Sequence, residues 1–369
     1  MIPGPVDVEE DVLDALAQPL IPHYGPQWMP IYNEVVARLK QLFGTQQSLF
    51  LIPGPGTAAL DAALGSLMRS GDKVVVASNG FFGRRTMAIA RGYGLEVCAV
   101  EGPLERPLDP DAIRKRLVAE RDAQALVVVH LETSTGVLNP LPEIAAVARE
   151  LEVPIIVDAV SSLGGVPLPV DQWGIDVCVT VINKCLACPP AVAPISISQR
   201  AWDQIDRKGD RSHGWYLDLR VWRDYAVNWA SWHPYPTTLP TNNIVAALAS
   251  LRQIEARGLE AHYQSFVQAA QMVRAGLKRL GFGLFADEAC TSPLITAVRG
   301  RPDLDIEDLR RYLMAEWQVM VSGGLDELHG KIFRIGHIGR ASSAEYSELL
   351  LEGIEAYLRL RGLQPGDRV

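Results

Sequence analysis

Short apolar runs alternate with helical patterns through the first two thirds of the chain, and this alternation limits its fold more than any other feature. Nearly continuous runs of Val, Ile and Leu are typical of strands that are buried on both faces. Intervening helices of roughly 10–15 residues indicate βαβ units and a mostly parallel sheet. We expect strands at 73–77, 96–100, 125–130, 154–160, 177–182 and 193–198. We expect helices at 57–69, 84–92, 109–120 and 141–151.

The pattern changes near residue 243, where long helical periodicity is followed by alternating strand-like and helical segments. This change predicts a large α/β domain at 18–242 and a smaller α+β domain at 243–369, the latter completed by residues 1–17, which include a predicted helix at 9–17. The segment 215–235 holds four of the eight Trp residues, so we expect partly irregular structure that packs in the core or against another subunit.

Composition excludes several classes of function. The chain has 369 residues and a net charge of −8, and it has no Lys/Arg-rich run, which argues against nucleic acid as a partner. No apolar stretch approaches the roughly 18 residues of a membrane span, and the acidic N-terminal segment is unlike a signal peptide. Five cysteines, an odd number, predict reduced thiols and a cytoplasmic location.

Lys184 is the one lysine of seven that follows a strand predicted to be buried. Burial of an ammonium is costly and lowers the pKa of a lysine. A lowered pKa makes the amine available for Schiff-base chemistry. The alternative is a lysine whose stem is buried while its ammonium reaches water.

Asp158 ends the preceding buried strand, in Val-Pro-Ile-Ile-Val-Asp-Ala-Val. Ligands of open parallel sheets bind beyond the carboxyl ends of the strands, where a carboxylate can hold a cationic ring nitrogen. A helix N-cap is the alternative role for a single Asp. Because Asp158 and Lys184 end successive strands, we expect them at one edge of the sheet.

Two further features suit anionic groups. Gly56 and Thr57 open a helix after the turn Pro-Gly-Pro, and a helix start of this kind suits a phosphate, although an ordinary turn is an equal alternative. Arg334 interrupts an apolar strand, where it could bind a carboxylate or form a structural ion pair. Cys185 and Cys188 have the spacing of metal or redox pairs, but no second Cys/His pair follows, so we interpret them as packing thiols and predict no metal site.

These features together resemble the class V aminotransferases of fold type I, in the alanine–glyoxylate and serine–pyruvate aminotransferase group. The resemblance runs from Pro-Gly-Pro-Val near the start to Arg-Ile-Gly-His-Ile-Gly near the end. Its most specific stretches are Glu-Thr-Ser-Thr-Gly-Val-Leu-Asn-Pro at 132–140 and Val-Asp-Ala-Val-Ser-Ser-Leu-Gly-Gly at 157–165. The fold that it implies is a large domain with a mostly parallel, mixed sheet flanked by helices, plus a smaller α+β domain. The cofactor that it implies is pyridoxal 5′-phosphate (PLP).

The resemblance also implies residue roles. Lys184 would bind PLP as an aldimine and move protons, and Asp158 would pair with the pyridine nitrogen. Val160 and Phe82 would lie on the two ring faces, and Thr133 near the ring hydroxyl. The remaining implied contacts are Gly56, Thr57 and Asn183 with the phosphate, Tyr235 and Thr238 with the phosphate of a neighbouring subunit, Arg334 with the substrate carboxylate, and Tyr24 with the substrate.

The implied function is a ping-pong transamination from a small amino acid, alanine or serine, to a 2-oxo acid, glyoxylate or pyruvate, in a homodimer with shared active sites. The triplet Asn183-Lys184-Cys185 is similar to that of 2-aminoethylphosphonate and pyridoxamine–pyruvate aminotransferases. An unusual donor, including ureidoglycine, is therefore the alternative. A lyase of the cysteine desulfurase type is less favoured, because the segment 322–330 lacks a Cys.

Overall fold

A computed structural model of the chain describes residues 1–209 and 214–364. Its central element is a seven-stranded sheet in the order β1-β9-β8-β7-β4-β2-β3 within these ranges. The strands β2, β3, β4, β7 and β8 are mutually parallel, and β9 runs antiparallel to both of its neighbours. The sheet is therefore mixed and mostly parallel, as predicted. Its strands are β1 (Ser48–Pro53), β2 (Lys73–Ser78), β3 (Glu96–Glu101), β4 (Ala125–Val129), β7 (Ile155–Asp158), β8 (Val177–Val179) and β9 (Val192–Ile197).

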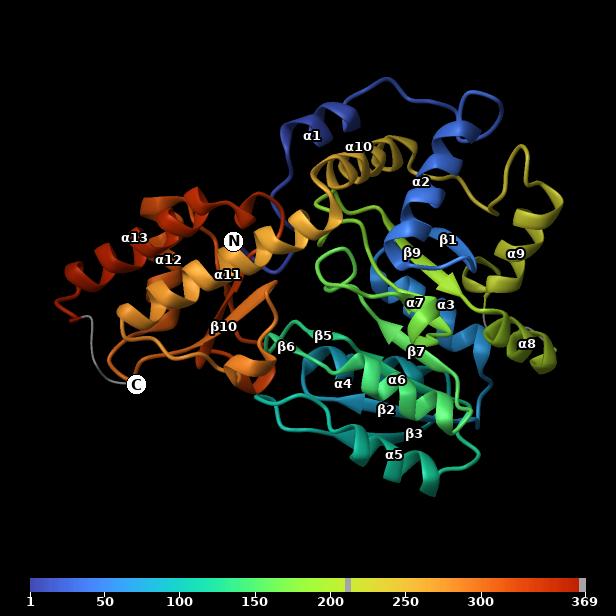
Figure 1. The fold of residues 1–369 in the computed structure, drawn as a ribbon, viewed down its shortest axis with the longest axis horizontal. Coiled ribbons are helices and arrows are strands. Elements are labelled where there is room, and N and C mark those ends of the chain that lie inside the picture. Colours follow the sequence, from blue (N-terminus) through green and yellow to red (C-terminus); the bar gives the residue numbers. More distant parts are fainter. Residues whose placement is uncertain (210–213, 365–369) are drawn as a thin grey trace.

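Helices flank this sheet (Figure 1), and the apolar side chains of helices and sheet form one large core. Helix α3 contacts β8 and β9, whereas α4 contacts β2, β3 and β4. The helices of this part are α1 (Glu10–Leu16), α2 (Met29–Phe43), α3 (Gly56–Leu67), α4 (Phe81–Gly92), α5 (Pro110–Ala119), α6 (Leu141–Glu150), α7 (Val170–Trp173), α8 (Gln199–Lys208), α9 (Leu219–Asn228) and α10 (Thr241–Arg257). A short hairpin pairs β5 (Leu131–Glu132) with β6 (Val137–Leu138).

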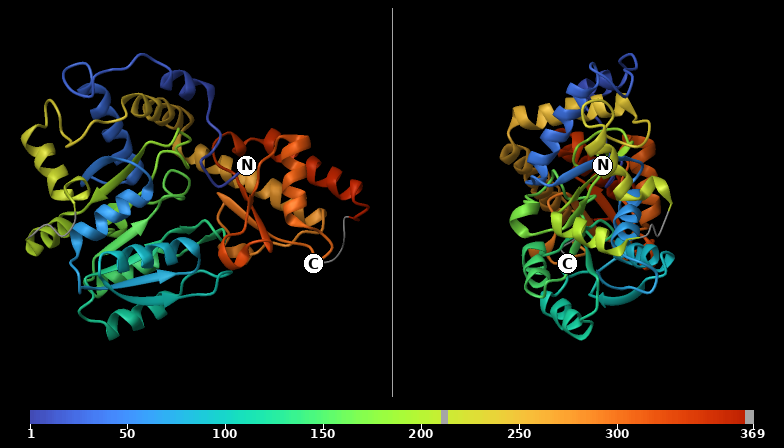
Figure 2. Two further views of the ribbon diagram at one scale, coloured as in Figure 1. Left: turned by 180° about the vertical axis from the view of Figure 1, so that it is seen from behind. Right: turned by 90° about the vertical axis from the view of Figure 1, so that its right-hand side faces the viewer.

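The C-terminal part lies to one side of the large sheet, as the orange and red segments of Figures 1 and 2 show. It contains an antiparallel sheet in the order β10-β12-β11 and has its own apolar core. Its strands are β10 (Ile295–Arg299), β11 (Ser322–Gly323) and β12 (Ile332–Gly336). Its helices are α11 (Leu259–Arg279), α12 (Ile306–Trp317) and α13 (Ala344–Leu360). This is the smaller α+β unit that the sequence predicts.

The packing of α1 and α10 bears on the predicted division near residue 243. Val12 of α1 and the apolar face of α10 as far as Ile254 pack in the large core, whereas the second core begins at Val273. The boundary at 242/243 and the grouping of residues 1–17 with the small domain stay predictions. By packing alone, both helices go with the large sheet. Residues 365–369 of the predicted small domain lie outside the described residues.

The aromatic segment at 215–235 is more regular than its composition suggests. Helix α9 occupies its middle, and Trp222 is buried in the core. Trp215, Trp229 and Trp232 are each nearly half exposed. The segment therefore combines a core contact with an exposed aromatic surface.

Candidate active site

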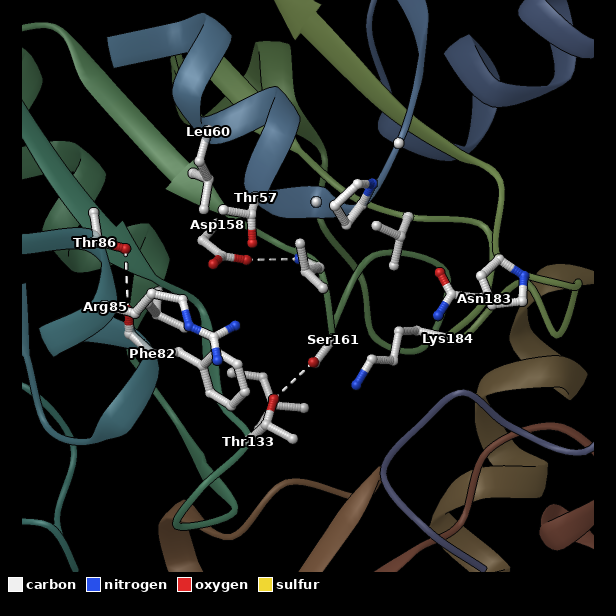
Figure 3. A pocket seen from close by; sticks show the side chains of 18 of the residues that line it. Thr57, Leu60, Phe82, Arg85, Thr86, Thr133, Asp158, Ser161, Asn183 and Lys184 are labelled. Carbon is white, nitrogen blue, oxygen red and sulfur yellow. Dashed lines mark hydrogen bonds between the residues drawn. The ribbon is translucent and has the colours of Figure 1, made fainter. Parts of the chain in front are cut away.

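One cavity of about 460 Å³ lies beyond the carboxyl ends of the central strands, and the predicted residues gather around it (Figure 3). Asp158 is the last residue of β7, and Lys184 follows the neighbouring strand β8. Because β7 and β8 are parallel, both side chains reach the same edge of the sheet. Eight predicted residues line the cavity: Gly56, Thr57, Phe82, Thr133, Asp158, Val160, Asn183 and Lys184.

Asp158 is a buried carboxylate with one backbone partner. Its Oδ1 accepts a hydrogen bond from the backbone N–H of Val160 at 2.9 Å. Burial raises the pKa of Asp158 to about 6, against the opposing effect of that hydrogen bond. A cationic partner in the cavity would favour the ionised form, so this carboxylate is suited to a protonated ring nitrogen.

Lys184 is a partly buried lysine whose amine is held by the N-terminal segment. Its Nζ donates to the backbone carbonyl of Pro3 at 2.7 Å. Burial lowers the pKa of Lys184 to about 8. Gly4 packs so closely that a Cβ at this position would lie 2.5 Å from the Lys184 Cδ atom. The lowered pKa leaves a larger fraction of free amine near neutral pH than an ordinary lysine has, which is the property that a nucleophilic lysine needs.

The start of α3 forms another wall of the cavity. The helix begins at Gly56 after Pro55, and no side chain caps its first N–H groups. Uncapped N–H groups at a helix start attract anions. The backbone approaches the opposite wall closely here, because a Cβ at Gly56 would lie 2.5 Å from Val160 Cγ2.

Arg334 lies in the middle of β12 and connects the small sheet to the cavity. Its Nε donates to the carbonyl of Gly323 at 2.9 Å, and its Nη1 donates to the carbonyl of Thr133 at 3.0 Å. Burial lowers the pKa of Arg334 to about 10, so the guanidinium stays charged at neutral pH. Arg334 contacts a residue of the cavity wall without forming part of that wall itself.

Three predicted residues lie away from the cavity of their own chain. Tyr24 is 47% exposed and contacts the ring of Trp232. The Tyr235 ring is buried, and its hydroxyl accepts from Trp28 Nε1 at 2.5 Å and donates to the carbonyl of His23. Thr238 is exposed. Contacts of these residues with substrate or with a neighbouring subunit's phosphate stay predictions.

Three residues of the site were missed from the sequence. Arg85 lines the cavity, with its guanidinium carbon 4.9 Å from the centre of the Phe82 ring, and its helical spacing from Phe82 was the available signal. Ser161 lines the cavity and shares a 2.7 Å hydrogen bond with Thr133. Glu132 lies behind the wall, fully buried. Both Ser161 and Glu132 fall within the specific motifs but had no role assigned.

Cys185 and Cys188, which flank the loop after Lys184, are buried free thiols. Their Sγ atoms contact the carbonyls of Ser161 and Leu186. Among the described residues, no three His, Cys, Asp or Glu side chains come together as a metal site. In the same part of the chain, no helix is long and apolar enough to cross a membrane.

The residues present fit PLP. An amine of lowered pKa, a carboxylate for a ring nitrogen and an uncapped helix start for a phosphate line one cavity, and the apolar Phe82 and Val160 also line it. These are the groups that such a cofactor requires.

Comparison with known proteins agrees with this chemistry. The family model described as Aminotransferase class-V matches residues 13–349. An uncharacterized aminotransferase of Methanocaldococcus jannaschii is 37% identical over 94% of this chain and 89% of its own length. The crystal structure of the ureidoglycine–glyoxylate aminotransferase from Bacillus subtilis superposes with a TM-score of 0.93 at 30% identity, covering 98% of this chain and 93% of that one. An alanine–glyoxylate aminotransferase structure from Nostoc gives the same TM-score and identity, over 97% of this chain and 94% of that one.

The chain therefore belongs to the class V aminotransferases, and it is a PLP-dependent enzyme of their fold. Its reaction moves an amino group between an amino donor and a 2-oxo acid.

Proposed function

We propose that this aminotransferase moves the amino group of a small amino acid, alanine or serine, to glyoxylate or pyruvate by a ping-pong mechanism. The observation that carries the proposal is the contact of the charged Arg334 with Thr133 in the cavity wall. An arginine at this position suits the α-carboxylate that amino acids and 2-oxo acids share. Glyoxylate as acceptor is supported by the names of the relatives from Bacillus and Nostoc.

PLP, when bound, supplies the electron sink that weakens the Cα–H bond of the donor. Lys184 would bind the cofactor aldehyde covalently and then carry the proton between Cα and the cofactor. Asp158 would keep the ring nitrogen protonated. The start of α3, with Gly56 and Thr57, and Asn183 would hold the phosphate.

Phe82 and Val160 would pack on the cofactor ring, and Thr133 would lie near its hydroxyl. Arg334 would orient the donor so that its Cα–H bond points at the amine of Lys184. Tyr24 would contact the substrate, and in a homodimer Tyr235 and Thr238 would reach the partner's phosphate. For Tyr235 this requires an exchange of its present hydrogen bonds with Trp28 and His23.

The second candidate is a transaminase of the same class with an unusual donor, either ureidoglycine, pyridoxamine or 2-aminoethylphosphonate. The triplet Asn183-Lys184-Cys185 favours this candidate, and one of the similar structures is named as a ureidoglycine–glyoxylate aminotransferase. In it, whenever the donor lacks an α-carboxylate, Arg334 would serve the 2-oxo acid or, for an aminophosphonate donor, the phosphonate.

A donor panel distinguishes the two candidates. The absorbance spectrum of the PLP-loaded protein is recorded before and after addition of alanine, serine, ureidoglycine, pyridoxamine or 2-aminoethylphosphonate. We expect alanine or serine to convert the cofactor to its amine form, and glyoxylate to restore the starting spectrum. Conversion by one of the unusual donors alone would select the second candidate. Turnover by Lys184→Ala at the wild-type rate would contradict both.

A further inference from the structure

The segment Glu132-Thr133-Ser134, which leads from the end of β5 into the turn between β5 and β6, lies between the cavity and the start of α4. The side chains of Glu132 and Ser134 contact α4, whereas Thr133 contacts the cavity and Arg334. The same short segment therefore touches the helix that carries Phe82 and the arginine that we assign to the substrate carboxylate.

Glu132 caps α4 from outside the helix. One of its oxygens, Oε2, accepts from the N–H groups of Phe82 and Gly83, both at 3.1 Å. The residue before the helix, Gly80, has no side chain to supply this cap, and a Cβ there would lie 2.5 Å from the Glu132 Cγ atom. A carboxylate at a helix start is favoured by the exposed N–H groups and by the helix dipole.

Ser134 completes the cap. Its Oγ accepts from the N–H of Phe81 at 3.0 Å and donates to Glu132 Oε1 at 2.5 Å. The first three N–H groups of α4 are thus all bonded to the turn. The helix position, and with it the Phe82 ring, depends on where the turn lies.

Thr133 connects the same turn to Ser161 in the cavity wall and to Arg334. Its Oγ1 shares a 2.7 Å hydrogen bond with Ser161, and its carbonyl accepts from Arg334 Nη1 at 3.0 Å. A shift of the turn would therefore move the Phe82 ring and the Arg334 guanidinium together.

We propose that Glu132 is a positioning residue, which sets the Phe82 ring against the cofactor and holds Arg334 in place through the turn. This inference rests on the roles proposed above for Phe82 and Arg334. A carboxylate that served only to stabilise the fold would leave cofactor affinity and substrate KM unchanged in any variant that folds.

Two variants test the proposal. Glu132→Gln keeps the shape of the side chain but turns one acceptor oxygen into an N–H₂ donor that faces other donors. Ser134→Ala removes the bond to Phe81 and is the milder change. Thr135→Val is the matched control, because the buried Thr135 belongs to the same turn, and its hydroxyl donates a hydrogen bond to the Glu132 carbonyl at 3.3 Å rather than to α4 or Arg334.

The readouts are the PLP dissociation constant of the apoprotein, the visible circular dichroism of bound PLP, and KM and kcat. For Glu132→Gln we expect the PLP dissociation constant and the donor KM each to rise by roughly tenfold or more, which is the effect of losing a charged hydrogen bond. The dichroism band should weaken as well. Ser134→Ala should change in the same direction by a smaller factor, and Thr135→Val should match the wild type.

A double-mutant cycle that combines Glu132→Gln with Phe82→Ala tests whether Glu132 affects PLP binding through the Phe82 ring. If Glu132 acts through Phe82, Glu132→Gln should add little to the PLP dissociation constant of Phe82→Ala. Fully additive effects, or folded Glu132→Gln and Ser134→Ala variants with wild-type affinity, dichroism and KM, would overturn the proposal. A wild-type protein that binds PLP but converts no donor would instead overturn the proposed function, and the affinity and dichroism comparisons would still decide the role of Glu132.

Discussion

At the residue scale, burial shifts the pKa values of two ionisable groups of the cavity, Asp158 and Lys184, in opposite directions. It raises the pKa of Asp158 to about 6 and lowers that of Lys184 to about 8. Burial disfavours whichever form is charged, so one cause brings a carboxylate and an amine toward neutrality from opposite sides. A cationic ring nitrogen bound beside Asp158 would favour the ionised form of this carboxylate further.

The lowered pKa of Lys184 predicts how cofactor capture depends on pH. Below about pH 8 the amine holds its proton and has no free lone pair, so the rate of PLP capture by the apoprotein should rise as the pH increases through about 8. A solvated lysine would instead require a pH near its ordinary value of 10.5. Stopped-flow absorbance at a series of pH values measures the midpoint, and a midpoint near 10 would contradict the burial argument.

Arg334→Lys tests the substrate assignment. Lysine keeps the charge but loses the planar pair of donors, which should cost about 1.5–3 kcal/mol of binding to a carboxylate, or roughly a 10- to 150-fold rise in donor KM. The absorbance of bound PLP should change little, because Arg334 does not line the cofactor cavity. Steady-state kinetics with alanine provide the test, and an unchanged KM would remove Arg334 from the substrate site.

Asp158→Asn tests the second ionisable group. An amide cannot hold the ring nitrogen in its protonated state, so kcat should fall by about 10²–10⁴-fold, which is the range for loss of a proton-holding group. Lys184 still binds the cofactor in this variant, so a visible band should remain. A kcat within a few-fold of the wild type would contradict the role.

At the scale of single elements, the contribution of the start of α3 to PLP binding can be measured with one substitution. Thr57→Val keeps the shape of the side chain and removes a hydroxyl at an uncapped helix start. Loss of one such hydrogen bond should cost about 0.5–1.5 kcal/mol, or a rise of roughly 2- to 13-fold in the PLP dissociation constant. Equilibrium dialysis of the apoprotein measures it. The N–H groups of the helix remain in place, so a complete loss of binding would mean that the hydroxyl does more than contact phosphate.

Much of the succession of elements was predictable, because buried parallel strands and amphipathic helices leave different periodicities. The strand β1 was missed, since its six residues sit between polar residues and a proline-glycine turn. The antiparallel direction of β9 could not be predicted, because the sequence of a buried strand does not indicate whether it runs parallel or antiparallel to its neighbours. The proximity of Asp158 and Lys184 could be predicted from the sequence, because the carboxyl ends of neighbouring parallel strands lie at the same edge of the sheet. Tyr24, Tyr235 and Glu132 could not be placed, because their environments depend on distant segments.

At the scale of the whole molecule, exposed aromatic residues gather on one part of the surface. Tyr24, Trp229 and Trp232 are each nearly half exposed, with ring centres 5.4 Å apart for Tyr24 and Trp232 and 5.6 Å apart for Trp229 and Trp232. Exposed aromatic clusters of this kind are typical of protein interfaces. Trp229 and Trp232 also lie near in sequence to Tyr235 and Thr238, the residues that we propose reach the partner's phosphate.

The proposed homodimer predicts a mass in solution twice that of one chain. Trp229→Glu should shift the molecule toward monomer and weaken PLP binding at the same time, because the shared sites would separate. Val118→Glu, which replaces a comparably exposed apolar residue on α5, should do neither. Light scattering combined with PLP titration makes the comparison. A dimer that survives Trp229→Glu with unchanged affinity would place the interface elsewhere.

The positions of the cysteines allow thiol reactivity to report which part of the structure opens first. Cys98, Cys178, Cys185 and Cys188 are buried, and burial raises the pKa of each thiol, whereas Cys290 is partly exposed. A thiol-directed reagent should therefore modify Cys290 first in the native state, without any cysteine being engineered away. Cys185 and Cys188 lie in the loop that holds Lys184, whereas Cys98 and Cys178 lie in strands of the large sheet. The delay before each pair reacts, measured by mass spectrometry, would therefore time the exposure of this loop separately from that of the sheet.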